Sequence, residues 1–490
     1  MALVSNRRRT ENLERLRRWE VTGVPVAKDP YARLAKLQAT ILGSGTVVML
    51  GDPEYDSDRQ LPHAHLPLDA RPLAIVHAAT IFDVREALAA ARDIGCKVTV
   101  RSGGHSSAGY SVGNGMVLDL GKLSYVSVDA DRERVRVGAG TPLGLVNFTL
   151  DAYDLHVPAG ICADVAVGGH VQGGGYGFTS RAFGLNLDHV ESVLVMRADG
   201  RLVVADRKTN DDLLWAMRGG TGNNFGVLLE VTYRTVPLED VWGFAYTWPL
   251  DQAPEVLVAM QRGFMRTGPA RLGYMPVLTA VTSGGGAPAE TRDVLLFVGV
   301  YAGSETDGRH AIAPLLAVGS PHELAVTGMG RIHHLNDALL GMLPGPHGYE
   351  VKRSRYVDEP VDRATWQKVV AYFRYRKNPF NLVALEPYGG AINAVPASDC
   401  AFIHRAVDFN VFIDSFFDAP EKASAAIDWM NDGLAHFEPF GSGRAYQNYP
   451  FAGEHDYRRA YWGEAFARLL EVKRKYDPDD LFSFPQGIKP

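Results

Sequence analysis

Two glycine-rich stretches of the chain each contain one side chain that can act as a nucleophile. Residues 101–106 read RSGGHS and include His105, and residues 160–170 read GICADVAVGGH and include Cys162. An imidazole and a thiolate both attack electron-poor carbons. Glycines are typical of places where the backbone comes close to another group. We therefore expect two loops that bring His105 and Cys162 against something bound.

The surroundings of these loops indicate what that bound molecule would be. RSGGHS follows the apolar segment KVTV, and backbone N–H groups in successive tight turns form a concavity that suits a pyrophosphate. No G-K-[ST] follows, so this is not a Walker loop, and GGHVQGGGYG at 168–177 lacks the spacing of the Rossmann fingerprint. A third stretch, RGGTGNNFG at 218–226, is also glycine-rich. One dinucleotide lying across all three would explain them, and tight turns without a ligand are the alternative.

Metal and disulfide chemistry are poorly supported by the sequence. The three cysteines are Cys96, Cys162 and Cys400, an odd number with no close pair, and we expect Cys96 and Cys400 to be buried thiols. A metal hydrolase built on His105, His156 or His170 would need paired ligand spacing such as H-E-x-x-H, which is lacking. We expect no metal.

The elements that must position the loops follow from hydrophobic periodicity. Strands are predicted at LAIVHAA, KVTV, MVLDL and ERVRVGAG, and helices at FDVREALAAARDIG, TPLGLVNFTLDAY and DDLLWAMRGG. Gly95 would end the first helix, and Asp199-Gly200 would close a hairpin over 189–206. NFGVLLEVTYRTVPL is predicted to be one long strand. Many short strands without regular β-α alternation indicate an α+β fold.

Four segments are expected along the 490 residues, since the chain is too long for one ordinary core. They are an N-terminal extension at 1–67, an α+β domain at 68–240, a domain of antiparallel sheet flanked by helices at 241–430, and a C-terminal segment at 431–490 that returns to the first domain. A short charged helix is expected from Thr10 through Trp19. In the third segment, AFIHRAVDFNVFID (401–414) is among the predicted strands.

Composition limits the partners. The chain is 46% hydrophobic and 22% charged with a net charge of −6, which is typical of a globular protein and gives no basic surface for nucleic acid. No window is apolar over the ~18 residues that a membrane span needs. Without an apolar segment after the cationic N-terminus, no export signal is predicted, and we expect a cytoplasmic protein. The oligomeric state stays open.

Several motifs, in one order, carry a resemblance to a known family. They are RSGGHSSAGYSVGNGMVLDL (101–120), GICADVAVGGHVQGGGYG (160–177), DDLLWAMRGGTGNNFGV (211–227), EPYGGAINAV (386–395), FIHRA (402–406), AYQNYP (445–450) and VKRKYDPDDLFSFPQGI (472–488). From about residue 70 onward the chain resembles the berberine-bridge-enzyme-like FAD-linked oxidases of the vanillyl-alcohol-oxidase superfamily. The resemblance implies a two-part PCMH-type FAD-binding domain at 68–240, a substrate domain at 241–430 and a berberine-bridge-like C-terminal motif.

The resemblance also implies how FAD is held. In doubly attached members the residue matching His105 bonds the 8α-methyl of the flavin and the residue matching Cys162 bonds C6, so bicovalent FAD is expected. Ala163-Asp164 departs from the Pro-Thr common after this cysteine. The further residues expected to bind the cofactor are Arg101, Ser102, Gly103, Gly104, Ser106, Gly169, Gly173, Gly174, Gly226 and Asn448.

Catalytic roles are expected for a few residues through the same resemblance. Tyr446, the first tyrosine of the Tyr-X-Asn motif, would be the base, which requires a neighbour that lowers its pKa. Glu386 or Tyr388, beside the PYGG turn, would assist it. Val165 would leave dioxygen a route to the flavin, which predicts an oxidase that makes hydrogen peroxide.

Two further candidates lie on the segment at 401–414. Arg405 and Asn410 are weaker candidates of the same kind as Glu386, and Val411 stands where some relatives carry a glutamate.

The expected reaction is oxidation of an alcohol carbon to a carbonyl on a sugar or glycosylated natural product, in secondary metabolism such as antibiotic biosynthesis. The partners would then be a small-molecule substrate and O2. Oxidative ring closure or desaturation is one alternative, and a flavin-carrying binding protein without turnover is another. Tyr301, Trp366 and Phe409 would stack on sugar faces or belong to the core, with the core favoured.

Overall fold

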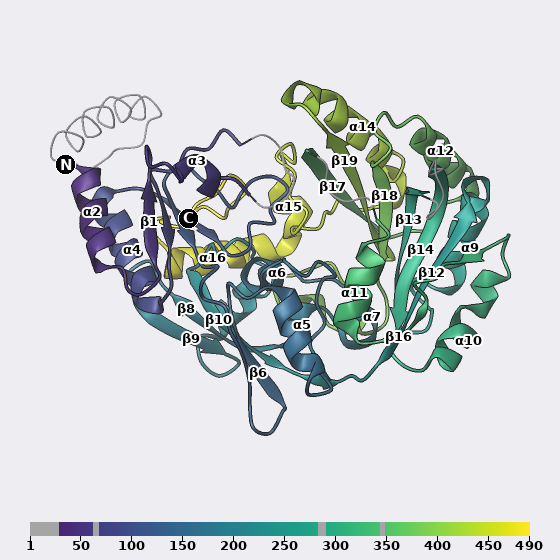
Figure 1. Ribbon diagram of the computed structural model, residues 1–490, viewed down its shortest axis with the longest axis horizontal. Helices are drawn as coiled ribbons and strands as arrows, with labels where there is room; N and C mark the ends of the chain where they lie inside the picture. Colours follow the sequence, from purple (N-terminus) through teal and green to yellow (C-terminus); the bar gives the residue numbers. More distant parts are fainter. Residues whose placement is uncertain (1–28, 62–67, 283–290, 344–347) are drawn as a thin grey trace.

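The computed structural model describes residues 29–61, 68–282, 291–343 and 348–490. Two lobes lie side by side, with the first two β-sheets in one and a large antiparallel sheet in the other (Figure 1). The predicted α+β class is confirmed. The helix expected from Thr10 to Trp19 lies outside the described residues.

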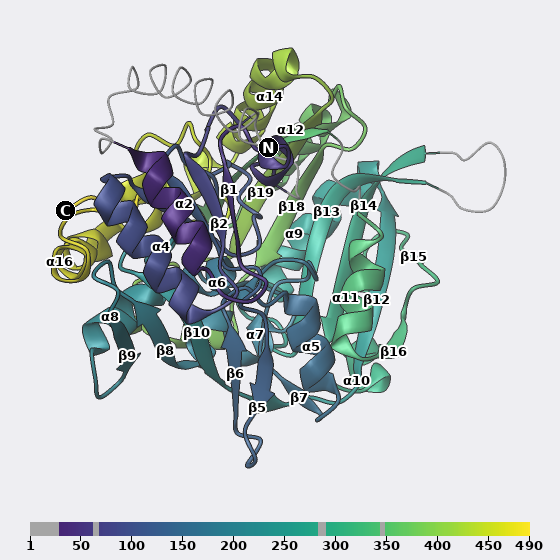
Figure 2. The same ribbon diagram turned by 60° about the vertical axis from the view of Figure 1, so that its left-hand side comes forward.

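The first sheet leads the chain into the RSGGHS loop. Its strand order is β1-β2-β4-β3, where β1 (Thr46–Met49) runs antiparallel to β2 (Ala74–His77), while β4 (Met116–Asp119) runs parallel to β2 and to β3 (Val98–Arg101). Helices α2 (Pro30–Thr40) and α4 (Ile81–Ile94) lie over this sheet (Figure 2).

The ends of α4 are fixed by local chemistry. Thr80 and Asp83 form a capping box at its start, and Gly95 ends it with φ of 79°, as the sequence predicts.

The second sheet supports the loop that carries Cys162. Its order is β5-β6-β10-β8-β9, with β5 (Val126–Val128), β6 (Arg134–Gly138), β8 (Val190–Met196), β9 (Leu202–Asp206) and β10 (Val227–Arg234). Around it lie α5 (Leu143–Asp151), α6 (Val167–Gln172), α7 (Ser180–Phe183), α8 (Asp211–Met217) and the small β7–β11 pair (Leu155–His156 and Val236–Pro237). The hairpin at Asp199-Gly200 is confirmed. The long strand predicted at NFGVLLEVTYRTVPL is interrupted at Thr235.

The third sheet has eight strands, in the order β15-β12-β14-β13-β18-β19-β17 with β16 paired to β12. These strands are β12 (Val241–Pro249), β13 (Leu272–Thr282), β14 (Thr291–Tyr301), β15 (His322–Glu323), β16 (Gly328–Gly330), β17 (Tyr349–Val357), β18 (Leu382–Pro387) and β19 (Phe409–Phe417). The prediction of a strand from residue 401 was wrong for 401–408, which form a loop in which Arg405 pairs with Asp188.

The two faces of this sheet have different surroundings. One face packs with α9 (Ala253–Gly263), α10 (Glu305–Leu316), α12 (Arg363–Arg374) and α14 (Ala423–Ala435) in an apolar core. Trp366 and Phe409 are fully buried there and Tyr301 packs against them, so these aromatic residues belong to the core. At one end of the other face, α11 (Ile332–Leu340) packs on the sheet. The opposite end of that face is turned to the first lobe (Figure 1).

The C-terminal segment packs on the first lobe. The short helix α13 (Ala391–Ala394) precedes β19, whereas α15 (Tyr457–Tyr461) and α16 (Phe466–Tyr476) belong to the C-terminal segment. After α16 the last residues run beside β3, where the Val98 amide donates to the Leu481 carbonyl at 2.8 Å. The buried Lys473 donates to the carbonyls of Asn224 and Phe482, at 3.0 and 2.9 Å. This segment therefore closes over the glycine-rich stretch at 218–226.

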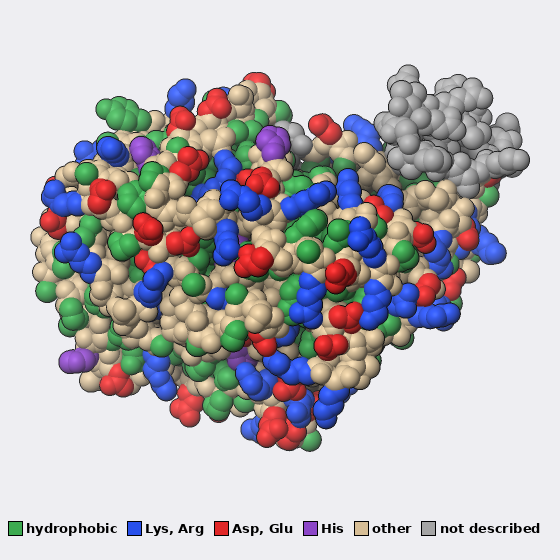
Figure 3. All heavy atoms as spheres, turned by 180° about the vertical axis from the view of Figure 1, so that it is seen from behind, with side chains coloured by type: hydrophobic (Ala, Val, Ile, Leu, Met, Phe, Trp, Pro, Cys, Tyr) green, Lys and Arg blue, Asp and Glu red, His purple; other side chains and the backbone are tan. Residues whose placement is uncertain are grey.

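The surface is mixed in charge. On the face shown in Figure 3, basic and acidic side chains are interspersed rather than gathered by sign. Among the described residues, no helix has both the length and the apolar character needed to cross a bilayer.

Candidate active site

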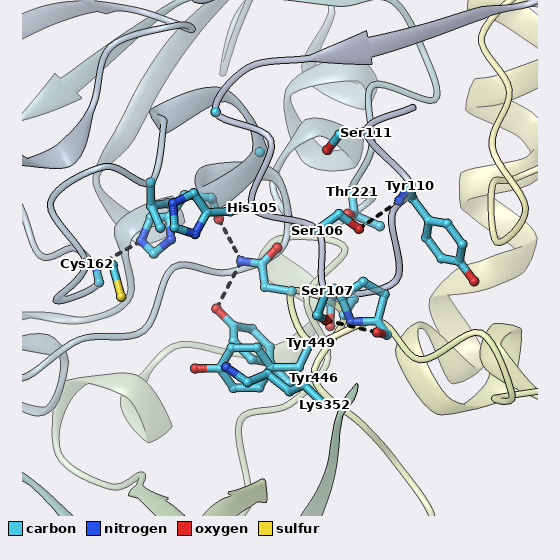
Figure 4. Close-up of a pocket in the computed structure, with 18 of the residues that line it drawn as sticks. His105, Ser106, Ser107, Tyr110, Ser111, Cys162, Thr221, Lys352, Tyr446 and Tyr449 are labelled. Carbon is cyan, nitrogen blue, oxygen red and sulfur yellow. Dashed lines mark hydrogen bonds between the residues drawn. The ribbon is translucent and has the colours of Figure 1, made fainter. Parts of the chain in front are cut away.

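A cavity of about 550 Å³ lies between the two lobes. One wall consists of the RSGGHS loop, the loop around Cys162 and the C-terminal segment, and the other consists of the inner faces of β13, β17, β18 and β19. Figure 4 shows His105 and Cys162 on one side of this cavity and Tyr446, Tyr449 and Lys352 together below them. The residues that sequence reasoning singled out from separate segments therefore meet in one place.

Both nucleophiles line the cavity. The Nε2 atom of His105 lies 3.2 Å from a carboxylate oxygen of Asp164. Because the Cys162 thiol lies deep in the protein, its pKa is raised to about 11, although the Lys352 ammonium acts in the opposite direction. The neighbouring His170 accepts the Gly160 N–H, and burial lowers its pKa to about 4, so it is neutral.

The glycines of the two loops allow close approach. A Cβ on Gly103 would stand 2.7 Å from the backbone nitrogen of Ala166, and Gly104 has φ of +73°. Gly169 faces open space within the cavity lining. The buried Ser102 hydroxyl in the same lining has no hydrogen-bond partner among the described residues. This unpartnered hydroxyl beside an open glycine backbone fits the cradle that a dinucleotide needs.

Most of the expected cofactor residues lie in the lining. They are Ser102, Gly103, Gly104, His105, Ser106, Cys162, Gly169 and Asn448, and the lining also includes Val165.

Four expected cofactor residues lie outside the lining, each for a packing reason. Arg101 pairs with Asp119 and donates to the Asp58 carbonyl. Gly226 packs on β8, where a Cβ would meet Val195 at 2.5 Å. Gly173 and Gly174 lie behind the catalytic candidates, since a Cβ on Gly173 would overlap Asn448 and one on Gly174 would crowd Phe402 and Tyr446.

The phenol oxygen of Tyr446 accepts three hydrogen bonds. The backbone N–H groups of Gly175 and Tyr176 donate at 2.9 and 3.2 Å, and the Asn448 amide donates at 3.1 Å. Donors aimed at an oxygen favour its charged form. Against them, burial and the nearby Glu386 carboxylate raise the pKa of Tyr446 to about 12. The glycine-rich segment after Cys162 thus supplies a hole for a phenolate.

Glu386 lies on the cavity face of β18. It accepts hydrogen bonds from the Tyr449 hydroxyl at 2.6 Å and from the Asn410 amide at 2.9 Å. Burial raises the pKa of Glu386 to about 7, while these two donors and Lys352 oppose the shift. The alternation expected for this strand is confirmed, because Ala384 lies with Glu386 in the cavity lining.

Tyr388 and Arg405 are not among the lining residues. The Tyr388 ring stacks on Tyr176, and its hydroxyl shares a hydrogen bond with Tyr356 at 2.9 Å. Arg405 pairs with the Asp188 carboxylate at 2.6 Å. Both side chains therefore serve the packing around the cavity.

Sequence reasoning missed a polar group on the sheet face. Lys352 on β17 lies 3.2 Å from Asp414 on β19 and 3.4 Å from Glu350, and its ammonium lies over the rings of Phe412 and Tyr449. All of these line the cavity. The sequence did offer a signal, namely the charged residues Glu350 and Lys352 inside an alternating strand. Charged side chains are rarely buried on a strand face unless they are paired, so their presence there indicates a polar site.

The described residues contain no group of three His, Cys, Asp or Glu that would hold a metal ion. His156 is buried against the Thr179 hydroxyl at 2.7 Å. Cys96 and Cys400 are buried free thiols.

The known proteins that this chain resembles are consistent with a dinucleotide site in this cavity. A profile of the FAD binding domain matches residues 72–206, and a profile described as berberine and berberine like matches residues 445–489. An uncharacterized FAD-linked oxidoreductase, YgaK of Bacillus subtilis, is 29% identical over 458 residues, covering 91% of this chain and 97% of its own. The chain therefore carries an FAD binding domain and a berberine-like C-terminal domain, and it is similar to berberine-bridge-enzyme-like FAD-linked oxidoreductases.

Other relatives of this flavoprotein carry more specific names. The xylooligosaccharide oxidase of Thermothelomyces thermophilus is 26% identical over 500 residues, covering 95% of this chain and 97% of its own. Among solved structures, wild-type BBE-like 1 of Physcomitrella patens has a TM-score of 0.82 at 25% identity and covers 93% of this chain and 98% of its own.

One further structure bears on the flavin. It is the glucooligosaccharide oxidase of Acremonium strictum, with a TM-score of 0.80 at 24% identity, covering 94% of this chain and 99% of its own. The FAD of that oxidase is described as 6-S-cysteinyl, 8α-N1-histidyl FAD. At this identity the likeness shows the fold alone.

Proposed function

We propose that this flavoprotein is an oxidase that converts an alcohol carbon of a sugar or glycosylated natural product into a carbonyl and passes the electrons to O2 as H2O2. The observation that carries the proposal is Tyr446, whose phenol oxygen sits in a hole of three N–H donors inside the cavity that also holds His105 and Cys162. The oligosaccharide oxidases among the similar proteins support the same substrate class.

His105 and Cys162 would each hold FAD by a covalent bond. Their positions on two touching loops of one cavity support this, as does the bicovalent flavin of the similar glucooligosaccharide oxidase. Ser102, Gly103, Gly104, Ser106 and Gly169 would bind its phosphates and ring edges. When bound, FAD supplies a hydride acceptor, and the protein supplies position and a base.

Tyr446 would take the proton of the substrate hydroxyl. Its donors come from a rigid backbone turn and from Asn448, so no reorganisation is needed when the oxygen carries charge. The proton then rests on the Tyr446 oxygen until it leaves with the product or through solvent. With ionised Glu386 nearby, burial still holds the pKa of Tyr446 at about 12, so the donors alone do not supply the lowered pKa that a base at neutral pH requires.

Glu386 would tune this base. Ionised Glu386 and ionised Tyr446 oppose one another, because both are negative and both are buried. A proton held on Glu386 therefore favours the phenolate. Its pKa of about 7 lets Glu386 gain or lose that proton near neutral pH.

The polar sheet face would bind the substrate's hydroxyl groups. One oxygen each of Glu350 and Asp414 is buried without a hydrogen-bond partner among the described residues, and both side chains line the cavity. Sugar hydroxyls are donors that would satisfy such acceptors. The ring of Phe412 in the same lining offers an apolar face for a sugar ring.

The test is a peroxide-coupled screen of oligosaccharides, macrolides and aromatic polyketide glycosides, followed by product analysis. A product that has lost two hydrogens at one alcohol carbon, with one H2O2 formed for each, supports the proposal. A product with a new ring or alkene and no new carbonyl would assign oxidative cyclisation or desaturation instead. Absence of turnover across the whole panel, with FAD bound, would favour a flavin-carrying binding protein.

A further inference from the structure

The carboxylate of Asp164 faces one nitrogen of His105. The two atoms, Asp164 Oδ1 and His105 Nε2, lie 3.2 Å apart. The imidazole is the more enclosed partner, with 20% of its side chain exposed against 62% for Asp164. The carboxylate therefore approaches the ring from the rim of the cavity.

The backbone around Asp164 is held firmly. The Val165 amide donates to the Cys162 carbonyl at 3.4 Å and closes a turn that contains Asp164. The amides of Leu143 and Gly144 donate to the carbonyls of Val165 and Ala163, both at 2.8 Å. Both ends of this turn are thus tied to the start of α5, and the turn presents Cys162 and Asp164 together.

The His105 loop is fixed against the same segment. Gly103 packs so closely on Ala166 that no side chain fits between them, and Gly168 does the same against the Ser102 hydroxyl. The Ser106 hydroxyl accepts the Tyr110 N–H at 3.0 Å. The distance between His105 and Asp164 is therefore set by backbone packing, and not only by two side-chain torsions.

No aligned hydrogen bond joins the two atoms, so the carboxylate acts on the ring through its charge. A carboxylate oxygen this close to Nε2 repels a lone pair there, which favours the tautomer with the imidazole proton on Nε2. The lone pair of the neutral ring then lies on Nδ1. His170 also faces His105, but it is buried and neutral and contributes no charge. We propose that Asp164 is a positioning residue that sets the tautomer of His105, so that FAD becomes attached through Nδ1.

A bond forms between Nδ1 and the 8α carbon, one C–H bond of that methyl group breaks, and two electrons remain on the flavin ring system. The imidazole, alkylated on Nδ1 and still protonated on Nε2, is then a cation, and the Asp164 carboxylate compensates its charge. Dioxygen takes up the two electrons with two protons, one from the methyl group and one from the imidazolium, and leaves as H2O2.

This inference rests on the proposed attachment of FAD to His105. The test uses the full chain with Cys162→Ala, so that any covalent flavin reports on His105 alone. In this background we compare Asp164, Asp164→Ala and Asp164→Glu, and follow the covalent fraction over time after FAD is added. The readouts are flavin fluorescence of the denatured band, the FAD mass on the His105 peptide, and the alkylated nitrogen identified by NMR of that peptide.

We expect the Nδ1 linkage in the parent, attachment slower by at least about tenfold in Asp164→Ala, and recovery in Asp164→Glu, which restores the acceptor. Total FAD, bound covalently or not, should be equal in all three. An Nε2 linkage in the parent, or an unchanged attachment rate in Asp164→Ala, would overturn the inference while leaving the attachment itself intact. Complete release of FAD from the denatured parent and from the wild-type chain would instead remove the proposed attachment, and the inference with it.

Discussion

The Tyr449 hydroxyl donates a 2.6 Å hydrogen bond to Glu386, and the Tyr449 ring stands edge-on to that of Tyr446, with centroids 4.9 Å apart. The two tyrosines of the AYQNY motif therefore have different tasks. One presents its oxygen to three N–H donors, and the other holds the carboxylate whose charge opposes ionisation of the first. This division suggests how each part can be tested alone.

Tyr446→Phe removes the proposed base and keeps the ring. We expect flavin reduction by substrate to slow by about 10²- to 10⁴-fold, the usual contribution of a positioned general base. Rapid-mixing measurement of flavin bleaching checks this. Tyr233→Phe is a matched control, because Tyr233 is also a buried tyrosine with one side-chain acceptor, Asn186, but is not in the cavity lining. Equal reduction rates in the two variants would rule out Tyr446 as the base.

Glu386→Gln tests the coupling of the two acids. The pKa of Glu386 is raised to about 7, so above pH 7 the wild-type carboxylate is charged and holds the pKa of Tyr446 up. The neutral amide lacks this charge, so Tyr446 should ionise at lower pH. The rise of the flavin-reduction rate with pH, which reports that ionisation, should therefore move to lower pH. If reduction is abolished at every pH, Glu386 is itself the base.

Single replacement of either nucleophile should leave FAD attached through the other. We expect His105→Ala and Cys162→Ala each to retain covalent flavin after denaturation, and the double variant to release all of it. Mass measurement of the intact chains distinguishes these states. Full release from either single variant would show that the two bonds do not form independently.

Val165→Leu tests the proposed oxygen route. Val165 lines the cavity two residues after Ala163, in the turn that presents Cys162. The larger side chain should slow reoxidation of the reduced flavin by O2 and leave its reduction by substrate unchanged. Stopped-flow reoxidation in air-saturated buffer measures the first, and an anaerobic reduction measures the second. Unchanged reoxidation would make Val165 a packing residue.

Lys473→Met should destabilise the protein strongly. The Lys473 ammonium is fully buried, pairs with Asp477 at 2.6 Å and ties the C-terminal segment to the loop at Asn224. Removing one partner leaves the Asp477 charge buried and unpaired, which costs about 3–5 kcal/mol. Urea unfolding checks this, and Lys475→Met, at an exposed pair with Asp212, should cost no more than about 1 kcal/mol.

The local elements were predictable because their signals are local. The helix that ends at Gly95 and the hairpin at Asp199-Gly200 each depend on a few neighbouring residues. The strand prediction at 401–414 was wrong for part of its length because it also depended on local residues alone. Its apolar residues suit a strand, but residues 401–408 lie away from the sheet, where Arg405 finds Asp188 more than two hundred positions earlier.

By itself the sequence determined which residues can do chemistry: a histidine and a cysteine in glycine loops, a Tyr-X-Asn motif, and a glutamate before PYGG. Only the tertiary structure decided which of them share a cavity. It left Arg101, Gly226 and Tyr388 out of the lining and brought in Tyr449, Lys352 and Asp414. Alternation tells which residues of a strand share a face, but the packing of that face against another lobe decides whether it meets a core or a cavity.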